Sequence, residues 1–238
     1  MSSPGFQMLP PNVQNSLLTV VNPKFAAYFA FAPNNKCIRG IRTGETPEGK
    51  PVFTYPNDSM ISDLTVLWSL FCEVNQLFKS ARVNIPTFFE ADNSLQGEIR
   101  RIIEDGEFWD SPDGPRSLRR VSLEDAVPAR LPEIWTTLRN GYAHFHWLFE
   151  NLSASDYWER MGWSTATQLE SFGLQSRVPD NYRAYIADAN GWNAARFWDL
   201  NDLRIIVTPY HILRYHLHLF LNILLNGDHH DVFGNLPI

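Results

Sequence analysis

Three polar residues in the middle of the chain have side chains suited to acid–base and phosphate chemistry: Arg139, Asn140 and His144. An imidazole titrates near neutrality, so His144 could act as a general base or acid on a ribose 2′-hydroxyl. When that hydroxyl attacks the adjacent phosphate, negative charge gathers on the non-bridging oxygens, and the guanidinium of Arg139 could stabilise it. Asn140 could orient the phosphate or hold the imidazole in one tautomer.

The segment that carries these residues has the periodicity of a long helix. Its apolar residues recur at helical spacing and fall within about 80° of one another: Leu131, Ile134, Leu138, Tyr142, Phe145, Phe149 and Leu152. The opposite side carries polar and small residues beside Arg139: Asn140, Ala143, His144 and Trp147. The pattern predicts a helix that buries one stripe and presents Arg, Asn, His and Trp to a partner.

The spacing of the two charged groups bears on the number of chains in the site. In a straight helix Arg139 and His144 would point about 140° apart. One chain would not easily bring both groups to one phosphate, whereas two antiparallel copies could, so the pattern favours a homodimer. The structural alternative is that Arg139 pairs with a surface acid, Asn140 is solvated and His144 caps a crevice. Spacing alone does not decide, because Arg204 and His211 have a similar one.

Two neighbouring residues are candidates for assisting roles. His146 lies near Arg139 by helical angle and could be an auxiliary site residue, or it could be structural or solvated. Trp147 could lie at an interface between chains or stack on a base. The histidines at 211, 216 and 218 do not have the spacing of a metal-binding helix pair, and the sequence predicts no metal site and no cofactor.

The bulk composition limits the class of protein. The chain has 238 residues, 44% hydrophobic and 13% aromatic, which is typical of a globular protein with one well-buried core. A formal net charge of −6 argues against a protein that coats nucleic acid non-specifically, so any contact with RNA has to be local. Cys37 and Cys72 form neither a ligand spacing nor a disulfide framework. We expect a reduced, cytoplasmic compartment.

Targeting and membrane signals are not expected. The first residues, MSSPGFQMLPPN, have neither the basic region nor the apolar region of a signal peptide. No apolar run reaches the length of about 18 residues that a membrane-spanning helix needs. The partner classes that stay open are an RNA substrate, a second copy of the chain, and an antitoxin or other regulatory protein.

Helices dominate the expected secondary structure. Four substantial helices are predicted, at Met60–Lys79, Ser94–Glu107, Ser122 through Asn151, and Pro209–Leu225. Gly227 is expected to end the last one. The segments 182–187 and 203–208 have strand-like content and could pair, and residues 38–55 could form a small hairpin. The fold class that fits best is all-α, an up-and-down helical bundle with a small peripheral extended or β element.

The segment Leu138–His144, LRNGYAH, resembles the signature of HEPN domains. In that signature an Arg is followed directly by a polar residue and, five positions after the Arg, by a His. HEPN domains are small helical bundles found in many bacterial RNA-cleaving toxins and defence proteins. The continuation FHWLFEN and the late helix RYHLHLFLN resemble plasmid- and prophage-borne members of the superfamily.

The resemblance implies a homodimer whose motif helices face one another. It also implies metal-independent endoribonuclease activity in phage defence or a toxin–antitoxin pair, with Arg139 and His144 catalytic and Asn140, His146 and Trp147 binding or assisting. The alternative is a non-catalytic helical module that binds a nucleotide, RNA or a protein. The expected domains are an N-terminal arm over 1–55, a helical domain over 56–226 with an insertion at 153–208, and a tail over 227–238.

Overall fold

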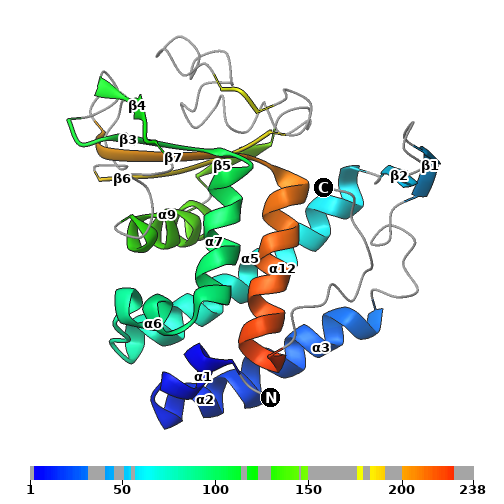
Figure 1. The fold of residues 1–238 in the computed structure, drawn as a ribbon, viewed down its shortest axis with the longest axis vertical. Coiled ribbons are helices and arrows are strands. Elements are labelled where there is room, and N and C mark those ends of the chain that lie inside the picture. The colour runs from blue at the N-terminus through cyan, green and yellow to red at the C-terminus, as the bar shows by residue number, and fades with distance from the viewer. Residues whose placement is uncertain are drawn as a thin grey trace. The chain divides into compact units, whose positions relative to one another are not determined.

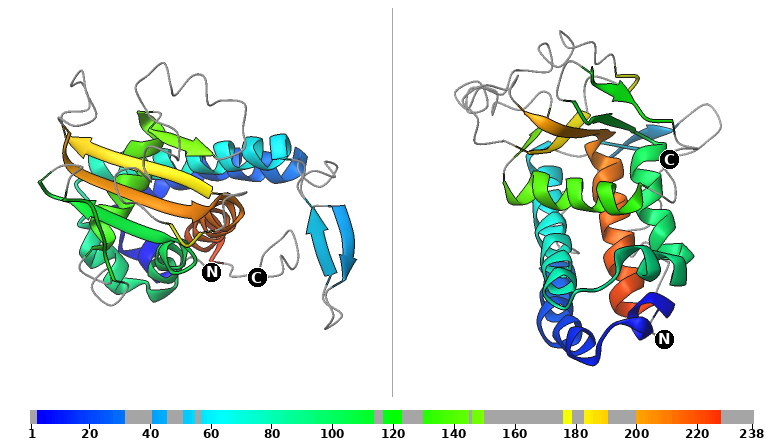
Figure 2. Two further views of the ribbon diagram at one scale, coloured as in Figure 1. Left: turned by 90° about the horizontal axis from the view of Figure 1, so that it is seen from above. Right: turned by 90° about the vertical axis from the view of Figure 1, so that its left-hand side faces the viewer.

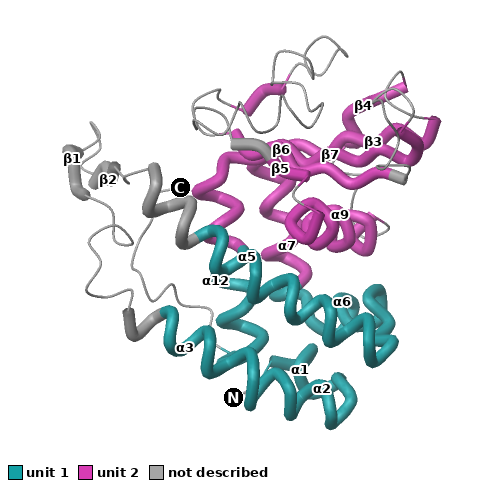
Figure 3. The backbone as a smooth tube through the Cα atoms, turned by 180° about the vertical axis from the view of Figure 1, so that it is seen from behind, with its two compact units in different colours: residues 1–95, 217–238 teal, residues 96–216 magenta. Residues whose placement is uncertain are grey.

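The computed structural model describes residues 3–31, 41–45, 51–54, 57–113, 117–122, 130–144, 146–149, 176–178, 183–190 and 200–227. Over these ranges the protein is mixed α/β, with helices and a five-stranded antiparallel sheet (Figure 1). Contacts divide the chain into two compact units, unit 1 (residues 1–95 and 217–238) and unit 2 (residues 96–216), which Figure 3 distinguishes by colour. The expected domain boundaries at 55 and 226 do not coincide with this division.

Unit 1 begins with helices, in residues that the sequence assigned to an N-terminal arm. They are α1 (Pro4–Met8), α2 (Pro11–Ser16), the π-helix η1 (Leu17–Val21) and α3 (Asn22–Phe31). Apolar residues recur here at intervals of three or four, and the buried ones are Phe6, Leu9, Val13, Leu17, Val21 and Phe25. The backbone amide of Gly5 also donates to Asp92 Oδ2 at 2.9 Å. This spacing forms a buried helical stripe despite the prolines.

The core of unit 1 is built on aromatic contacts. Its later helices are α5 (Asn57–Ser80) and α6 (Ile85–Ala91), and the unit also takes the first residues of α7 (Asn93–Glu104) and most of α12 (Tyr210–Asn226). Phe71 and Phe220 have ring centroids 5.5 Å apart, and those of Phe78 and Phe88 are 4.9 Å apart. The predictions of helices at 60–79, 94–107 and 209–225 are confirmed in outline, and Gly227, at φ 65°, ends α12.

Two short strands in unit 1 form the hairpin that the sequence predicted. They are β1 (Ile41–Glu45) and β2 (Pro51–Thr54), which pair antiparallel. Among the described residues, no helix is long and apolar enough to cross a membrane.

Unit 2 is built on the five-stranded sheet. Its strands are β3 (Glu107–Ser111), β4 (Arg119–Arg120), β5 (Trp147–Phe149), β6 (Arg183–Asn190) and β7 (Asn201–Pro209), in the order β4-β3-β7-β6-β5. Helix α9 (Leu131–Ala143) lies along one face, where it contacts β6 and β7 (Figures 1 and 2). The predicted pairing of 182–187 with 203–208 is confirmed, but these strands form the centre of a sheet rather than a peripheral element.

The two faces of the sheet differ in composition. Residues paired across neighbouring strands lie on the same face. The face that α9 covers carries apolar residues and then a charged row: Phe108, Ile206 and Ile186, followed by Asp110, Arg204 and Asp188. The opposite face carries an apolar cluster formed by Trp109, Tyr185, Ala187, Leu203, Ile205 and Val207, together with Val178 and Leu200. We call these the α9 face and the apolar face.

The all-α fold class is therefore wrong, since the sheet forms the frame of unit 2. Two of its strands lie in segments for which the sequence predicted a different structure. β3 begins at Glu107, where the sequence predicted the end of a helix, and β5 lies inside the predicted motif helix. Short apolar runs fit a strand and a buried helix equally well, and here hydrogen bonds to neighbouring strands stabilise the extended form. Much of the expected 153–208 insertion, and all of the tail beyond 227, lie outside the described residues.

Candidate functional site

Helix α9 is held against the sheet by its apolar stripe and by a close backbone contact. Leu131, Ile134 and Leu138 are buried, as the periodicity predicted, while Tyr142 is half-buried. Gly141 is also buried, and a Cβ placed on it would lie 2.4 Å from Cγ2 of Ile186 in β6. Only a residue without a side chain allows the helix to approach the strand this closely. The contact fixes the C-terminal turn of α9, which carries the candidate site.

The predicted motif helix ends in the middle of the motif. The backbone N–H of His144 donates to Asn140 O at 3.0 Å, and that of His146 donates to Gly141 O at 2.8 Å. The chain then enters β5, where Trp147 pairs with Ile186. The expectation that the motif helix continues to Asn151 was wrong, because the edge of the sheet satisfies the backbone groups beyond Ala143. Phe145 and Leu152, which were assigned to the stripe, lie outside the described residues.

His144 lies at the C-terminal cap of α9 and is exposed. The ring of His144 lies 5.7 Å from that of His146, measured between centroids. Its exposure is what a proton-transfer group that meets an external substrate requires.

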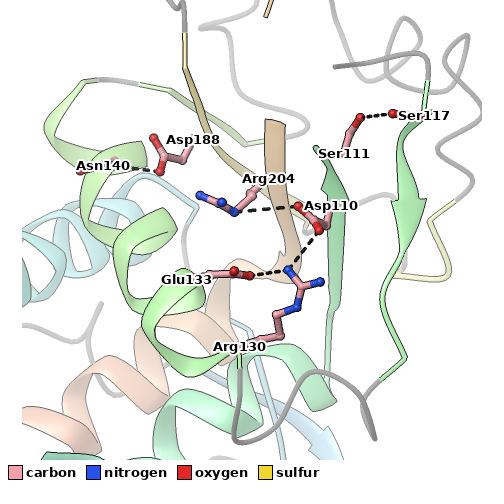
Figure 4. Close-up of polar contacts among 8 residues, drawn as sticks. All are labelled: Asp110, Ser111, Ser117, Arg130, Glu133, Asn140, Asp188 and Arg204. Carbon is pink, nitrogen blue, oxygen red and sulfur yellow. Dashed lines mark hydrogen bonds and ion pairs between the residues drawn. The ribbon is translucent and has the colours of Figure 1, made fainter. Parts of the chain in front are cut away.

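Asn140 faces the sheet rather than an external partner. Its Nδ2 donates to Asp188 Oδ2 on β6 at 3.0 Å, and Figure 4 shows the two side chains directed toward one another. Its Oδ1 accepts a hydrogen bond of 2.6 Å from Nη1 of Arg139, whose side chain is half-buried. The prediction that Asn140 presents an outward face was wrong. It links the neighbouring arginine to a carboxylate of the sheet.

His146 is buried, with 8% of its surface exposed, and is fixed by its backbone. Its carbonyl accepts a hydrogen bond of 2.8 Å from Ala187 N on β6. Burial, with a smaller contribution from the charge of His144, lowers the pKa of His146 to about 3. The imidazole is therefore neutral at physiological pH, and the structural alternative given above for His146 suits this position better than an assisting role. Trp147 is half-buried on the α9 face of the sheet.

A second group of charges lies on the same face of the sheet, at the N-terminal end of α9. Arg130 Nη1 donates to Asp110 Oδ2 at 3.1 Å and to Glu133 Oε2 at 2.6 Å. The hydrogen bond to Glu133, supported by Asp110, raises the pKa of Arg130 above its ordinary value despite the opposing effect of burial. Arg204 Nε lies 3.9 Å from Asp110 Oδ1 (Figure 4).

The charged row of the sheet connects the groups at the two ends of α9. Asp110, Arg204 and Asp188 are cross-strand partners on three adjacent strands. Asp110 holds the arginines near the start of α9, while Asp188 holds Asn140 near its end. The row therefore attaches both ends of the helix to the sheet through polar contacts.

Sequence reasoning did not identify Asp188 or Asp110. A usable signal was present at Asp188, because Ala184, Ile186 and Asp188 alternate along a strand-like segment and place a carboxylate on a buried face. Asp110 lies near the end of β3, directly before a run of turn-forming residues that hides the strand in the sequence. Neither acid could be matched to Asn140 or Arg130 from sequence, since the partner depends on strand register.

The structure thus gathers Arg139, Asn140 and His144 at one end of α9, with His146 and Trp147 just beyond on the edge strand. Among the described residues, no group of three His, Cys, Asp or Glu side chains could hold a metal ion. Comparison of the chain with protein-family models, with curated proteins and with solved structures gave no match.

Proposed function

We propose that the protein is an endoribonuclease and that the C-terminal end of α9 cleaves RNA without a metal ion. The observation that carries the proposal is the arrangement of an exposed imidazole, His144, one helical turn after an asparagine whose amide holds the guanidinium of Arg139. The resemblance of LRNGYAH to the HEPN signature, limited to the motif, supports the same chemistry. The helical-bundle architecture of that family forms no part of the proposal.

The roles follow from the chemistry of the side chains. His144 takes the proton from a ribose 2′-hydroxyl, whose oxygen attacks the adjacent phosphorus while the bond to the 5′-oxygen breaks. The leaving 5′-oxygen takes up a proton from water, so the products are a 2′,3′-cyclic phosphate and a 5′-hydroxyl. Arg139 donates hydrogen bonds to the non-bridging oxygens as negative charge develops on them. Proton transfer by a well-placed side chain contributes roughly 100- to 10,000-fold to a rate.

The net charge supports a selective enzyme. At −6 the chain repels RNA at long range, so the local cation at Arg139 has to supply the attraction for phosphate. A selective substrate, or control by a separate antitoxin in the bacterial cytoplasm, agrees with this balance.

The decisive experiment is RNA cleavage in EDTA by the purified protein and by His144→Ala and Arg139→Ala variants. We expect cleavage with a 2′,3′-cyclic phosphate product, and losses on the order of 100-fold or more in both variants. Thr136→Ala, an exposed position on the same helix, is the matched control and should keep full activity. Equal cleavage by all the proteins indicates a contaminating nuclease, and binding of RNA without cleavage favours a non-catalytic module.

A mixing experiment tests the proposed homodimer. If the active site combines Arg139 of one protomer with His144 of another, a mixture of Arg139→Ala and His144→Ala proteins regains part of the activity. If each site lies within one chain, the mixture stays inactive. Sedimentation of the wild-type protein gives the oligomeric state independently of activity.

A further inference from the structure

Asp188 connects the candidate site to the sheet through a continuous hydrogen-bonded chain. Its Oδ2 accepts a hydrogen bond of 3.0 Å from Asn140 Nδ2, and Asn140 Oδ1 accepts one of 2.6 Å from Arg139 Nη1. The carboxylate comes from β6, at a sequence separation of 48 residues from Asn140. No part of the catalytic proposal above assigns Asp188 a role.

The donor and acceptor properties of the groups fix the direction of this chain. An ionised carboxylate only accepts hydrogen bonds, and a guanidinium only donates them. The amide of Asn140 can therefore satisfy both neighbours in one orientation, with its NH₂ toward Asp188 and its oxygen toward Arg139. With the carboxylate absent, the amide could turn over and present its NH₂ to the guanidinium, which cannot accept it.

We propose that Asp188 is a positioning residue of the ribonuclease site. By fixing the orientation of Asn140, it holds the guanidinium of Arg139 where the phosphate of the substrate binds. The inference rests on the proposed function, because Arg139 is assigned there to the transition state. A displacement of about 1 Å in such a group costs on the order of 100-fold in rate.

A purely structural role for Asp188 makes a different prediction. The end of α9 is already held by the contact of Gly141 with Ile186 and by buried Leu138. If Asp188 served only as one more attachment for the helix, its removal would lower the free energy of unfolding and leave kcat of the folded protein unchanged. If Asp188 acts through Asn140, its removal changes little once Asn140 is absent.

The test is a double-mutant cycle in the RNA cleavage assay. We expect Asp188→Ala to lower kcat by roughly 10- to 100-fold with a smaller change in KM. Asp188→Asn keeps an acceptor oxygen and should restore activity to within a few-fold of wild type. The Asn140→Ala/Asp188→Ala double variant should be no slower than Asn140→Ala alone. If the two losses multiply instead, or if Asp188→Ala leaves kcat unchanged, the proposal is overturned.

Asp110 offers a matched control for the cycle. It is an acid in the same charged row, but its partners are Arg130 and Arg204 rather than Asn140. Because Asp110 and Asn140 share no partner in these contacts, we expect any loss caused by Asp110→Ala to multiply with that of Asn140→Ala.

A spectroscopic measurement separates failure of this inference from failure of the proposed function. The side-chain NH₂ resonances of Asn140, assigned by their loss in Asn140→Ala, should shift in Asp188→Ala and remain near their wild-type position in Asp110→Ala. If the wild-type protein fails to cleave RNA but the shift is seen, the proposed activity is wrong while the positioning contact stands. An unshifted Asn140 resonance in Asp188→Ala removes the contact and overturns the proposal.

Discussion

The two faces of the sheet in unit 2 use acidic side chains differently. On the apolar face, Glu107 is 4% exposed and its carboxylate accepts hydrogen bonds from Trp109 Nε1, Arg120 Nη1 and the backbone N–H of Arg177. These contacts join neighbouring parts of the fold. On the α9 face, Asp188 holds Asn140, which in turn holds Arg139 at the end of the helix. Similar chemistry thus stabilises one face and orients a candidate site on the other.

Glu107 and Asp188 differ in where their hydrogen-bond partners lie. Trp109, one of the groups bound to Glu107, belongs to the apolar cluster, so the loss of the carboxylate leaves a buried indole N–H without its acceptor. The partner of Asp188 lies at the end of a helix that is anchored by other contacts. We therefore expect stability to depend mainly on the first acid and activity mainly on the second.

The largest stability effect is expected for Glu107→Gln. The side-chain NH₂ of glutamine would oppose at least one donor among Trp109 and Arg177, and the charge partner of Arg120 is lost. We expect the free energy of unfolding to fall by about 3 kcal/mol, with kcat of the folded protein unchanged. Urea denaturation measures the first quantity and RNA cleavage the second.

Glu104→Gln is the matched control for this prediction. Glu104 pairs with Arg100 on the exposed side of α7, where an ion pair contributes about 0–1 kcal/mol. A lower kcat in Glu107→Gln, measured where the variant is fully folded, would mean that the two faces do not have separate roles.

Gly141→Ala tests the close contact between α9 and the sheet. The new methyl group would lie 2.4 Å from Cγ2 of Ile186, so α9 has to move away from the sheet. We expect the free energy of unfolding to fall by about 1–3 kcal/mol, and kcat to fall as well because α9 carries Arg139 and His144. Thermal and urea unfolding measure the first effect, and RNA cleavage the second.

Two further variants test whether the clash with Ile186 causes the effect of Gly141→Ala. Gly97→Ala adds a methyl group in α7 where no heavy atom apart from the neighbouring residues and the backbone of the helix lies within 4 Å, and it should stabilise the protein by roughly 0.5–1 kcal/mol. Adding Ile186→Ala to Gly141→Ala removes the clashing methyl group and should restore part of the activity. No recovery of activity would show that the position of α9 does not control the site.

The effect expected from His146 depends on pH and is small near neutrality. Its pKa is about 3 in the folded protein against an ordinary value of 6.5, so below pH 6.5 the unfolded chain binds a proton that the folded protein does not. Stability is then complete above pH 6.5 and is lost as the pH falls toward 3. Between pH 7 and pH 5 we expect a loss of about 2 kcal/mol.

His146→Phe should remove this part of the pH dependence while leaving the shape of the site largely intact. Urea denaturation at pH 7 and pH 5, for both proteins, measures the difference. If the two proteins lose the same stability between these pH values, the imidazole of His146 is not buried in its neutral form.

The sequence determined the elements whose signals are local and long. The helix at 57–80 and the last helix, with its terminal Gly227, follow from apolar periodicity over many residues and from capping. The pairing of β6 with β7 follows from two apolar segments of strand-like composition. The sequence also singled out Arg139, Asn140 and His144 by residue type.

Only the tertiary structure decided where those three residues point. The apolar continuation beyond Ala143 fits a helix by its periodicity, but Trp147–Phe149 forms backbone hydrogen bonds with β6 instead. The strand register then puts Asp188 opposite Asn140, because a shift of one residue would move it to the other face. Residue types limit the chemistry of a site, whereas the pairing of distant strands decides which groups meet, since that pairing depends on contacts between segments far apart in the chain.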